Sequence, residues 1–555
     1  MFDHYKSTEY TGYYTKNSIR NNDTQMPYPR RHAKHIRTGV WHSLLYFPLS
    51  YITIESTMLF RLFLAALILS ASLTVCTGQP VTFVEPKGTA VVAAPVIEPP
   101  TFEPLFEGWQ KPKLLLVFTG FLDGYIEPCG CAGIEQMKGG LSRRHTCLQQ
   151  LEKQGWDVLP IDAGNLNKGF GQQEELKFNF VIDEAYRLMK YQAAGIGNRE
   201  LQFPTSTLIN YFVDVPGVSK RYTSINVAIF DFDTVTPYRI LEKNSVKIGV
   251  VSVLGNSLLK GLNNEEIITA PAAEKLREIL PKLAAEKCSR QVLIIHGTDG
   301  EINQLLDEFA GKFDFILPGN TPAEPPFLPK KIGQTMILEV GEKGRYALAV
   351  GLFDDPAMPI RYERVPLDAR YENSPVITEL MGMYQNQLKE AGLSGLGITP
   401  IQHSRQGKFV GSQSCADCHE AANVAWRRSN HSKAWQSLKE TAKPARNFDP
   451  ECIACHVVGW NATELLPYKG GFLSEKETPR LVSVGCESCH GPGEEHIRAE
   501  SGSNVALQET LRRAIRLPVE GGTAKKQCLT CHDGDNSPGF DFETYWKKIE
   551  HPAMD

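Results

Sequence analysis

The stretch VGCESCHGPGEEH, Val484–His496, decides how the C-terminal part of this chain is built. Cys486 and Cys489 stand two residues apart, His490 follows directly, and His496 comes six residues later. Two such thiols can chelate zinc, form a redox disulfide, or form thioethers with a porphyrin. The histidine directly after the second cysteine favours the third use, because thioether attachment places that imidazole under the iron.

The Cys-x-x-Cys-His pattern occurs four times, always in the last third of the chain. Random placement of the 13 cysteines and 14 histidines would give about 0.008 such motifs. A pair of zinc sites would use the cysteines but would leave the four histidines without a function. We therefore predict four covalently bound haem c groups, with the motifs numbered one to four in chain order: Cys415, Cys418, His419; Cys452, Cys455, His456; Cys486, Cys489, His490; and Cys528, Cys531, His532.

The second axial position of each iron needs a ligand from elsewhere in the chain. His431 lies twelve residues after His419 on a predicted helix, and His496 follows a Gly-Pro-Gly turn. His403 stands before the first motif, and the alternative for every candidate is a surface histidine without a ligand function. Four tryptophans are expected to pack against the haems: Trp426, Trp435, Trp460 and Trp546. The predicted distal ligands are His403, His431, His496 and His551.

Residues 400–555 resemble the tetrahaem cytochrome c554 and c-prime family. The resemblance rests on KFVGSQSCADCHEAANVAWRRSNHSKAW, CIACHVVGW, VGCESCHGPGEEH and CLTCHDGDNSPGFDFETYWKKIEHP. It implies a mostly α, haem-packed multihaem cytochrome c domain in which most irons carry two histidines. It also implies that one haem can keep an open coordination position.

The region from Lys113 alternates between short apolar runs and amphipathic stretches. KLLLVFT, DVLPIDAG, VKIGVVSVLG, RQVLIIHG and FDFILPGN are typical of buried strands, and PAAEKLREILPKLAAEK of a helix. GRYALAVGLFDD and IRYERVPLD are expected to form a closing hairpin, and SPVITELMGMYQNQLKEAG a helix. The pattern predicts an α/β domain over residues 113–370, then a helix and linker over 371–399.

The α/β region resembles the metallophosphatase domain of the periplasmic 5′-nucleotidase family, which implies a layered sandwich with two metals bound at strand ends. The matching loops are TGFLDGY, DAGN, GIGNRE, IIHGTDGE and PGNTP, mostly in altered form. Ligand positions are changed to Asn165, Arg199, Asn320 and Pro322, while Asp123, Asn198 and His296 remain. Two close dications need carboxylates and imidazoles, so we expect the fold without the family's activity.

Several side chains in this region keep more than one interpretation. His296 is either a retained ligand or a histidine that caps a strand end. Arg199, Asn165 and Asn320 either bind an anion, or the arginine is solvated or salt-bridged. The thiols of Cys129, Cys131 and Cys147 could form a structural disulfide, serve a redox or metal-binding function, or be inert.

The N-terminal segments point to export. Residues 58–76 have the pattern of a secretory signal, with Arg61 ahead of an apolar run and Cys76 in a lipoprotein-like position. Because a signal of this kind stands at the start of a protein, residues 1–57 are expected to be non-native upstream sequence. A lipidated Cys76, a plain cleaved signal and an uncleaved anchor all remain open. Residues 77–112 are proline-rich and predict an extended linker. We expect a protein that is periplasmic or anchored on the outer side of the cytoplasmic membrane.

The composition argues against a nucleic-acid partner, and the motifs are compatible with three functions. A formal net charge of −4 and the absence of a basic tract argue against nucleic acid, and 42% hydrophobic residues are ordinary for a globular protein. The leading hypothesis is an electron carrier that serves redox partner proteins and has a non-catalytic phosphatase-like scaffold. The alternatives are a multihaem oxidoreductase acting on a small nitrogen or sulfur compound at an open haem, and a metallophosphoesterase with a cytochrome tail.

Overall fold

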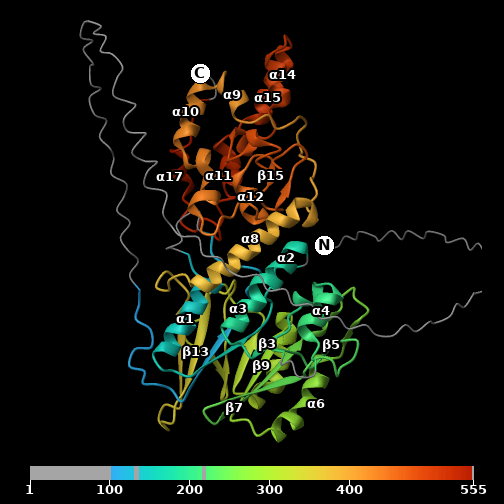
Figure 1. The fold of residues 1–555 in the computed structure, drawn as a ribbon, viewed down its shortest axis with the longest axis vertical. Helices are drawn as coiled ribbons and strands as arrows, with labels where there is room; N and C mark the ends of the chain where they lie inside the picture. Colours follow the sequence, from blue (N-terminus) through green and yellow to red (C-terminus); the bar gives the residue numbers. More distant parts are fainter. Residues whose placement is uncertain (1–101, 130–136, 170, 216–219, 553–555) are drawn as a thin grey trace, which may run out of the picture. The chain divides into compact units, whose positions relative to one another are not determined.

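The computed structural model describes residues 102–129, 137–169, 171–215 and 220–552 (Figure 1). The predicted upstream extension, the signal with Cys76, most of the linker, and Cys131 lie outside these residues. Within the described residues, no helix combines the length and the apolar character needed to cross a membrane.

The α/β part contains two six-stranded sheets. The first has the strand order β14-β13-β1-β2-β3-β4, in which β1 (Leu114–Thr119), β2 (Val158–Asp162), β3 (Ala193–Gly195) and β4 (Tyr222–Thr223) run parallel. The second has the order β11-β12-β10-β9-β7-β6, with β7 (Val246–Leu254), β9 (Arg290–His296) and β10 (Phe315–Pro318) parallel. Its remaining strands are β6 (Tyr238–Lys243), β11 (Lys330–Ile332) and β12 (Thr335–Ile337). Both sheets are mixed, with antiparallel pairs at one edge of the first sheet and at both edges of the second.

The two sheets pack face to face, and strand β1 shows how. Leu114, Leu116 and Phe118 share one apolar cluster with Ile294 and Phe315 of the second sheet. The intervening residues of β1 point to the opposite face, because side chains alternate along a strand, and they join the cluster of helices α1 (Leu141–Lys153), α3 (Asp183–Leu188) and α8 (Pro375–Gly395). The strand is buried on both faces, which explains its uninterrupted apolar sequence.

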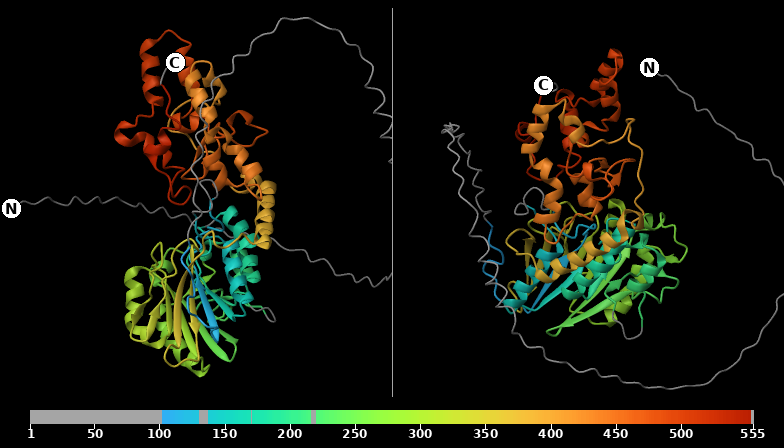
Figure 2. Two further views of the ribbon diagram at one scale, coloured as in Figure 1. Left: turned by 90° about the vertical axis from the view of Figure 1, so that its left-hand side faces the viewer. Right: turned by 45° about the horizontal axis from the view of Figure 1, so that its top comes forward.

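Helices α6 (Ala272–Ala285) and α7 (Asp299–Phe309) cover the outer face of the second sheet. Figure 2 shows the sheets between these helices on one side and the α1–α3 helices on the other. The order of layers is helix, sheet, sheet, helix. Because the carboxyl ends of parallel strands meet at one edge, the loops after β1, β2, β3 and β9 converge there.

The predicted fold class is confirmed: an α/β part precedes a mainly helical one. The expected hairpin is the antiparallel pair β13 (Tyr346–Leu352) and β14 (Ile360–Pro366), and the expected helix after it is α8. Residues 172–188 form three successive helical segments: α2 (Gln172–Lys177), a π-helical turn (Phe178–Ile182) and α3. The domain boundaries stay predictions.

The C-terminal part consists of short helices joined by loops. Its apolar cluster includes Phe409, Trp435, Ile453, Trp460 and Phe472. Of the four tryptophans expected to pack against haems, Trp435 and Trp460 lie in this cluster. Trp426 donates its indole N–H to the Val484 carbonyl (2.7 Å), and Trp546 packs against Phe542 with ring centres 5.5 Å apart.

Ion pairs join the α/β part to the second and fourth motif segments. Lys177 of α2 lies between Glu174 (2.7 Å) and Glu451 (3.1 Å), and Glu451 stands one residue before Cys452. Arg446 pairs with Glu127 after β1. Asp535, just after the fourth motif, pairs with two cations near β13, Lys343 and Arg345.

We predict that Lys177→Ala strongly destabilises the protein. The lysine side chain is fully buried, and its removal leaves two carboxylates without their cation, which costs about 3–5 kcal/mol for a buried pair. Denaturant unfolding of the haem-loaded protein measures this loss. Lys190→Ala is the matched control, because the Lys190–Glu152 pair is largely exposed and worth about 1 kcal/mol or less. Equal losses for the two variants would contradict the prediction.

Candidate haem-binding sites

Each Cys-x-x-Cys-His motif lies on or directly after a short helix. The helices are α9 (Gln413–Ala416), α12 (Pro450–His456), α13 (Cys486–His490) and α16 (Thr523–Cys528). Residues three apart share one helix face, so a helical turn presents both sulfurs of a motif in the same direction. Helix α12 has the best-defined start: Pro450 occupies the first turn, and the Asp449 carboxylate accepts the Glu451 amide hydrogen (3.0 Å).

Three proximal histidines each face a predicted distal histidine. The ring centres of His419 and His496 are 6.3 Å apart. Those of His532 and His431 are 6.1 Å apart, and those of His490 and His551 are 5.9 Å apart. Every pair joins a motif histidine to one outside the motifs, on a different helix or loop.

These separations fit an iron held between two imidazoles. Two metal–nitrogen bonds of about 2 Å, together with about 1 Å from each nitrogen to its ring centre, place ring centres about 6 Å apart. The residues present therefore fit bis-histidine haem at three motifs: His419 with His496, His490 with His551, and His532 with His431.

The Nδ1 atoms of two motif histidines support their assignment as iron ligands. Nδ1 of His490 lies 2.7 Å from the Ile515 carbonyl oxygen, and Nδ1 of His456 lies 2.6 Å from that of Ala434. An Nδ1–H group that donates to a carbonyl fixes the tautomer and leaves Nε2 for a metal. Burial lowers the pKa of both imidazoles, which keeps them in the neutral form that binds metals.

His403, the fourth distal candidate, lies in a different environment. Its ring packs edge-on against Tyr468 (4.6 Å between centres) and Phe409 (5.8 Å). Its Nδ1 accepts the backbone N–H of Arg405 at 3.0 Å. The structure thus brings three of the four predicted distal histidines to a motif histidine and places the fourth in an aromatic contact.

The sulfurs show which motifs are neighbours. The Cys415 thiol hydrogen-bonds the Cys486 sulfur, and the Cys455 thiol hydrogen-bonds that of Cys531. Cys489 lies close enough to Cys528 for their charges to interact. In the haem-loaded protein these sulfurs would be thioethers, which have no S–H group to donate. The contacts therefore show only that the sulfurs of the two motifs lie close together. The motifs follow one another in space in the order one, three, four, two.

A buried carboxylate ties the first motif to the third. Glu487, inside the third motif, accepts the amide hydrogens of Val410 (2.9 Å), Gly411 (2.7 Å) and Gly493 (2.7 Å). The Ser412 hydroxyl accepts the Cys486 amide hydrogen at 3.1 Å. Buried polar groups need such partners, so these bonds fix the segment that precedes the first motif against the third motif.

The altered strand-end loops of the α/β part also come together. Nη1 of Arg199 lies 3.0 Å from Oδ1 of Asp123, and the Arg199 amide donates to Asn165 Oδ1 (3.4 Å). Asn165 Nδ2 faces His296 Nδ1 at 3.5 Å, while His296 Nε2 donates to the Ala163 carbonyl at 2.6 Å. Asn320 is exposed. Of the two interpretations of Arg199, this geometry favours the salt-bridged one.

The electrostatics of this cluster favour a neutral imidazole. Burial lowers the pKa of His296 to about 4. Burial raises the pKa of Asp123, and the Arg199 cation opposes that rise. The neighbouring Glu200 is fully buried, and burial raises its pKa to about 7 although it accepts the Gly197 amide hydrogen (2.8 Å). Among the described residues, no group of three or more His, Cys, Asp or Glu side chains is arranged to hold a metal ion.

The α/β cysteines differ from one another. Cys147 is buried in α1, where its thiol hydrogen-bonds Tyr371, and burial raises its pKa to about 11. It therefore fits an inert thiol. Cys129 lies near Cys452 of the second motif, close enough for their charges to interact. A Cys129–Cys131 disulfide cannot be placed, since Cys131 is outside the described residues.

Sequence reasoning missed the polar cluster around Lys177, Asp449, Gln173 and Gln385. Asp449-Pro450 just before a motif is a helix-start signal that could have identified the cap. Nothing in the sequence around Lys177 distinguishes it from a solvated lysine on an amphipathic helix. Its burial depends on a second segment, more than 270 residues away in the chain.

Comparison with known proteins gives a match for part of the C-terminal region. Residues 414–491 match the family described as "Cytochrome c554 and c-prime", which implies covalently bound haem c in this segment. Cytochrome c-554 of Nitrosomonas europaea is 31% identical over 161 residues. That alignment covers 26% of this chain and 63% of the relative, so the chain spans less than two thirds of the relative's length.

Solved structures similar to the chain are phosphatase-type proteins. The 5′-nucleotidase precursor from Thermus thermophilus gives a TM-score of 0.43 at 14% identity, with 59% of this chain and 68% of that chain covered. The calcineurin-like phosphoesterase YfkN from Bacillus subtilis gives 0.39 at 17%, with 49% and 97% covered. The chain is thus similar to cytochrome c554 in its C-terminal part and to 5′-nucleotidase structures in its α/β part.

Proposed function

We propose that this protein is an exported electron carrier with four covalently bound haem c groups. The observation that carries the proposal is the three histidine pairs, each with ring centres about 6 Å apart and each containing one motif histidine. The similarity to cytochrome c-554 supports it. The redox partners are proteins outside this chain, and the predicted signal places it in the periplasm or on the outer side of the cytoplasmic membrane.

The residues of the chain position the groups and set their environment. Bound haem iron alternates between ferric and ferrous states and so carries one electron at a time. The cysteine pairs would hold the porphyrins, and the paired imidazoles at three motifs would ligate the irons. The contacts between motif sulfurs place neighbouring motifs side by side, which gives electrons a continuous route in the order one, three, four, two.

The α/β part serves as a scaffold for the second and fourth motifs. Lys177 and Glu127 bind the segment around the second motif, and Lys343 and Arg345 bind Asp535 beside the fourth. The Arg199–Asp123 pair supports loss of phosphatase chemistry, because a guanidinium neutralises the carboxylate a metal would need.

A second candidate function follows from the position of His403. Since this histidine packs against Tyr468 and Phe409, it does not pair with a motif histidine. The haem at the second motif would then take only His456 from the predicted ligands and would keep a position for a small molecule. A multihaem oxidoreductase acting on a nitrogen or sulfur compound would use that position.

We predict a haem content of four per chain. Pyridine haemochrome analysis of the mature protein should give this value, and acid-acetone extraction should leave all haem on the protein. The double variant Cys486→Ala/Cys489→Ala should contain three. Cys147→Ala is the control and should retain four, because that thiol lies in α1. A content of two or fewer in the unmodified protein refutes the proposal.

We predict three low-spin haems and one with an open position. His431→Ala should convert one low-spin ferric signal to high-spin, because it removes the ring facing His532. His403→Ala is the matched control and should leave the spectrum unchanged. The high-spin signal of the unmodified protein should shift on addition of cyanide or nitric oxide. Four low-spin signals that become three in His403→Ala would overturn the assignment.

We predict no metal-dependent phosphatase activity. Two dications at the strand ends would face the Arg199 guanidinium, and repulsion between one dication and this unit charge at about 4 Å costs on the order of 8 kcal/mol at an effective dielectric of about 20. Elemental analysis should find little manganese or zinc, and added divalent metal should not produce hydrolysis of nucleotides. Stoichiometric non-haem metal, with turnover that His296→Ala abolishes, would favour the phosphoesterase.

A further inference from the structure

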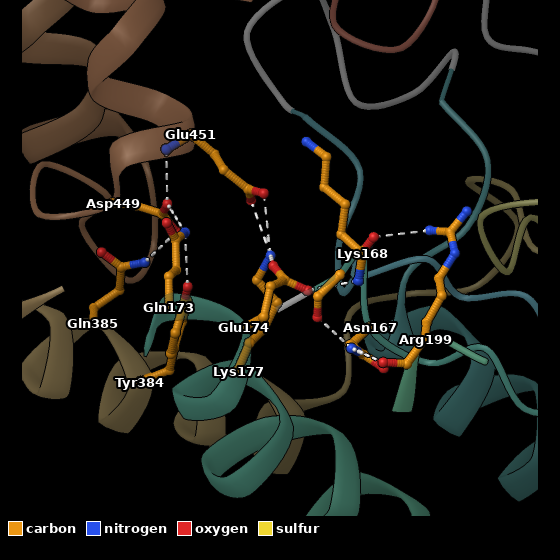
Figure 3. A network of polar contacts seen from close by, with 11 residues as sticks. Asn167, Lys168, Gln173, Glu174, Lys177, Arg199, Tyr384, Gln385, Asp449 and Glu451 are labelled. Carbon is orange, nitrogen blue, oxygen red and sulfur yellow. Dashed lines mark hydrogen bonds and ion pairs between the residues drawn. The ribbon is translucent and has the colours of Figure 1, made fainter. Parts of the chain in front are cut away.

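A buried carboxyl group stands at the start of the helix that carries the second motif. Asp449 is only 6% exposed and caps α12. Its Oδ1 accepts hydrogen bonds from the Glu451 amide (3.0 Å) and from Gln173 Nε2 of α2 (2.9 Å). Its Oδ2 accepts one from Gln385 Nε2 of α8 (3.2 Å). Figure 3 shows the carboxyl enclosed by side chains from these segments.

Gln385 can serve both protonation states of this carboxyl. The side chain is 5% exposed, and its Oε1 has no hydrogen-bond partner among the described residues. A half-turn of the amide would present Oε1 to Asp449 Oδ2. A proton on Oδ2 would then be donated to Oε1, which would give this acceptor a partner, while Nε2 would move to the position that Oε1 occupies now. If the Asp449 carboxylate only capped the helix, it would only accept hydrogen bonds and would not need an acceptor such as Gln385 Oε1 beside it.

The charges around Asp449 leave one carboxyl without a cation of its own. From α2 it faces Lys177, which pairs with Glu174 and Glu451, and from α8 it faces the Tyr384 phenol. Within its own segment lie Arg446, which pairs with Glu127, and the Cys452 sulfur. Four carboxyl groups therefore face three cations: Glu127, Glu174, Asp449 and Glu451 with Lys168, Lys177 and Arg446.

We propose that Asp449 takes up one proton when the haem on the second motif takes up one electron. This inference rests on the proposed electron-carrier function. The electron comes from a one-electron donor protein, the proton comes from solvent and binds Oδ2, and no other bond is formed or broken. Asp449 is thus a residue that tunes the potential of this haem through charge, and its neighbour Gln385 stabilises the protonated form.

The electrostatics agree with the geometry. Burial and the Glu451 charge raise the pKa of Asp449, Lys177 opposes both effects, and the resulting pKa is about 6. An added electron on the group attached to α12 increases the negative charge nearby, so the proton is held more tightly in the reduced state. At pH values between the pKa of Asp449 with the haem oxidised and its higher pKa with the haem reduced, reduction and protonation are coupled.

The test is a redox titration of the haem-loaded full chain with mediators at a series of pH values. One of the four reduction steps should change its equilibrium constant tenfold per pH unit near pH 6, which is about 59 mV for one electron. Asp449→Asn should remove the pH dependence of that step. The other three reduction steps should keep the pH dependence that they have in the unmodified protein. Asparagine caps helices as well as aspartate does, so the start of α12 is preserved.

Asp541→Asn is the matched control. Asp541 caps α17 (Phe542–Trp546) by accepting the Thr544 amide hydrogen (2.9 Å), and it is exposed. This variant should leave all four pH dependences unchanged. A pH dependence that persists in Asp449→Asn overturns the inference while leaving the electron-carrier function intact. A chain whose haems do not titrate reversibly overturns the proposed function itself.

A second measurement keeps the inference testable if Asp449→Asn fails to fold. The reduced-minus-oxidised infrared difference spectrum of the unmodified protein should contain the C=O stretch of a protonated carboxyl, and this band should shift in D2O. Gln385→Leu removes the acceptor for the proton and should move the band to higher frequency. Absence of a carboxyl band in the unmodified protein contradicts the proposal.

Discussion

Under the proposed haem binding, the rest of the C-terminal structure depends on one spacing: two imidazoles must stand about 6 Å apart to hold an iron between them. A Cys-x-x-Cys-His motif supplies only one of the two. The other must come from a separate segment, so every bis-histidine site is a tertiary contact. His496 on α14 (Glu494–Glu500), His431 on a 3-10 turn (Asn430–Lys433) and His551 near the C-terminus meet this requirement from three different elements.

Short helices could not hold these distances by themselves, since each buries little surface. The spacing is maintained by polar contacts that run between motifs, such as those of Glu487 with the backbone before the first motif. Ion pairs then fix the second and fourth motif segments to the α/β part. The edge of the sheets where a phosphatase would bind metals instead contains Arg199 and Asp123 paired with each other.

The contact between the two parts also changes the chemistry of the side chains within it. Lys177, Glu174, Glu451 and Asp449 would be ordinary surface residues on an isolated domain. Buried together, they form a cluster in which charge on any one affects the others. Under the proposed function, this cluster would let the α/β part influence the redox properties of the haem on the neighbouring helix.

Much of this protein was determined by its sequence alone. The motifs predict the haem attachment residues because thioether chemistry needs two cysteines on one helical turn and a histidine next to them, all within five residues. The buried strands were equally predictable, since KLLLVFT is apolar throughout, as a strand covered on both faces must be. Only the tertiary structure decided which histidines meet, and why His403 does not: it packs against Tyr468, 65 residues away in the chain. It also decided that Lys177 and Asp449 are buried, because burial of a charge depends on a partner segment that no local pattern reveals.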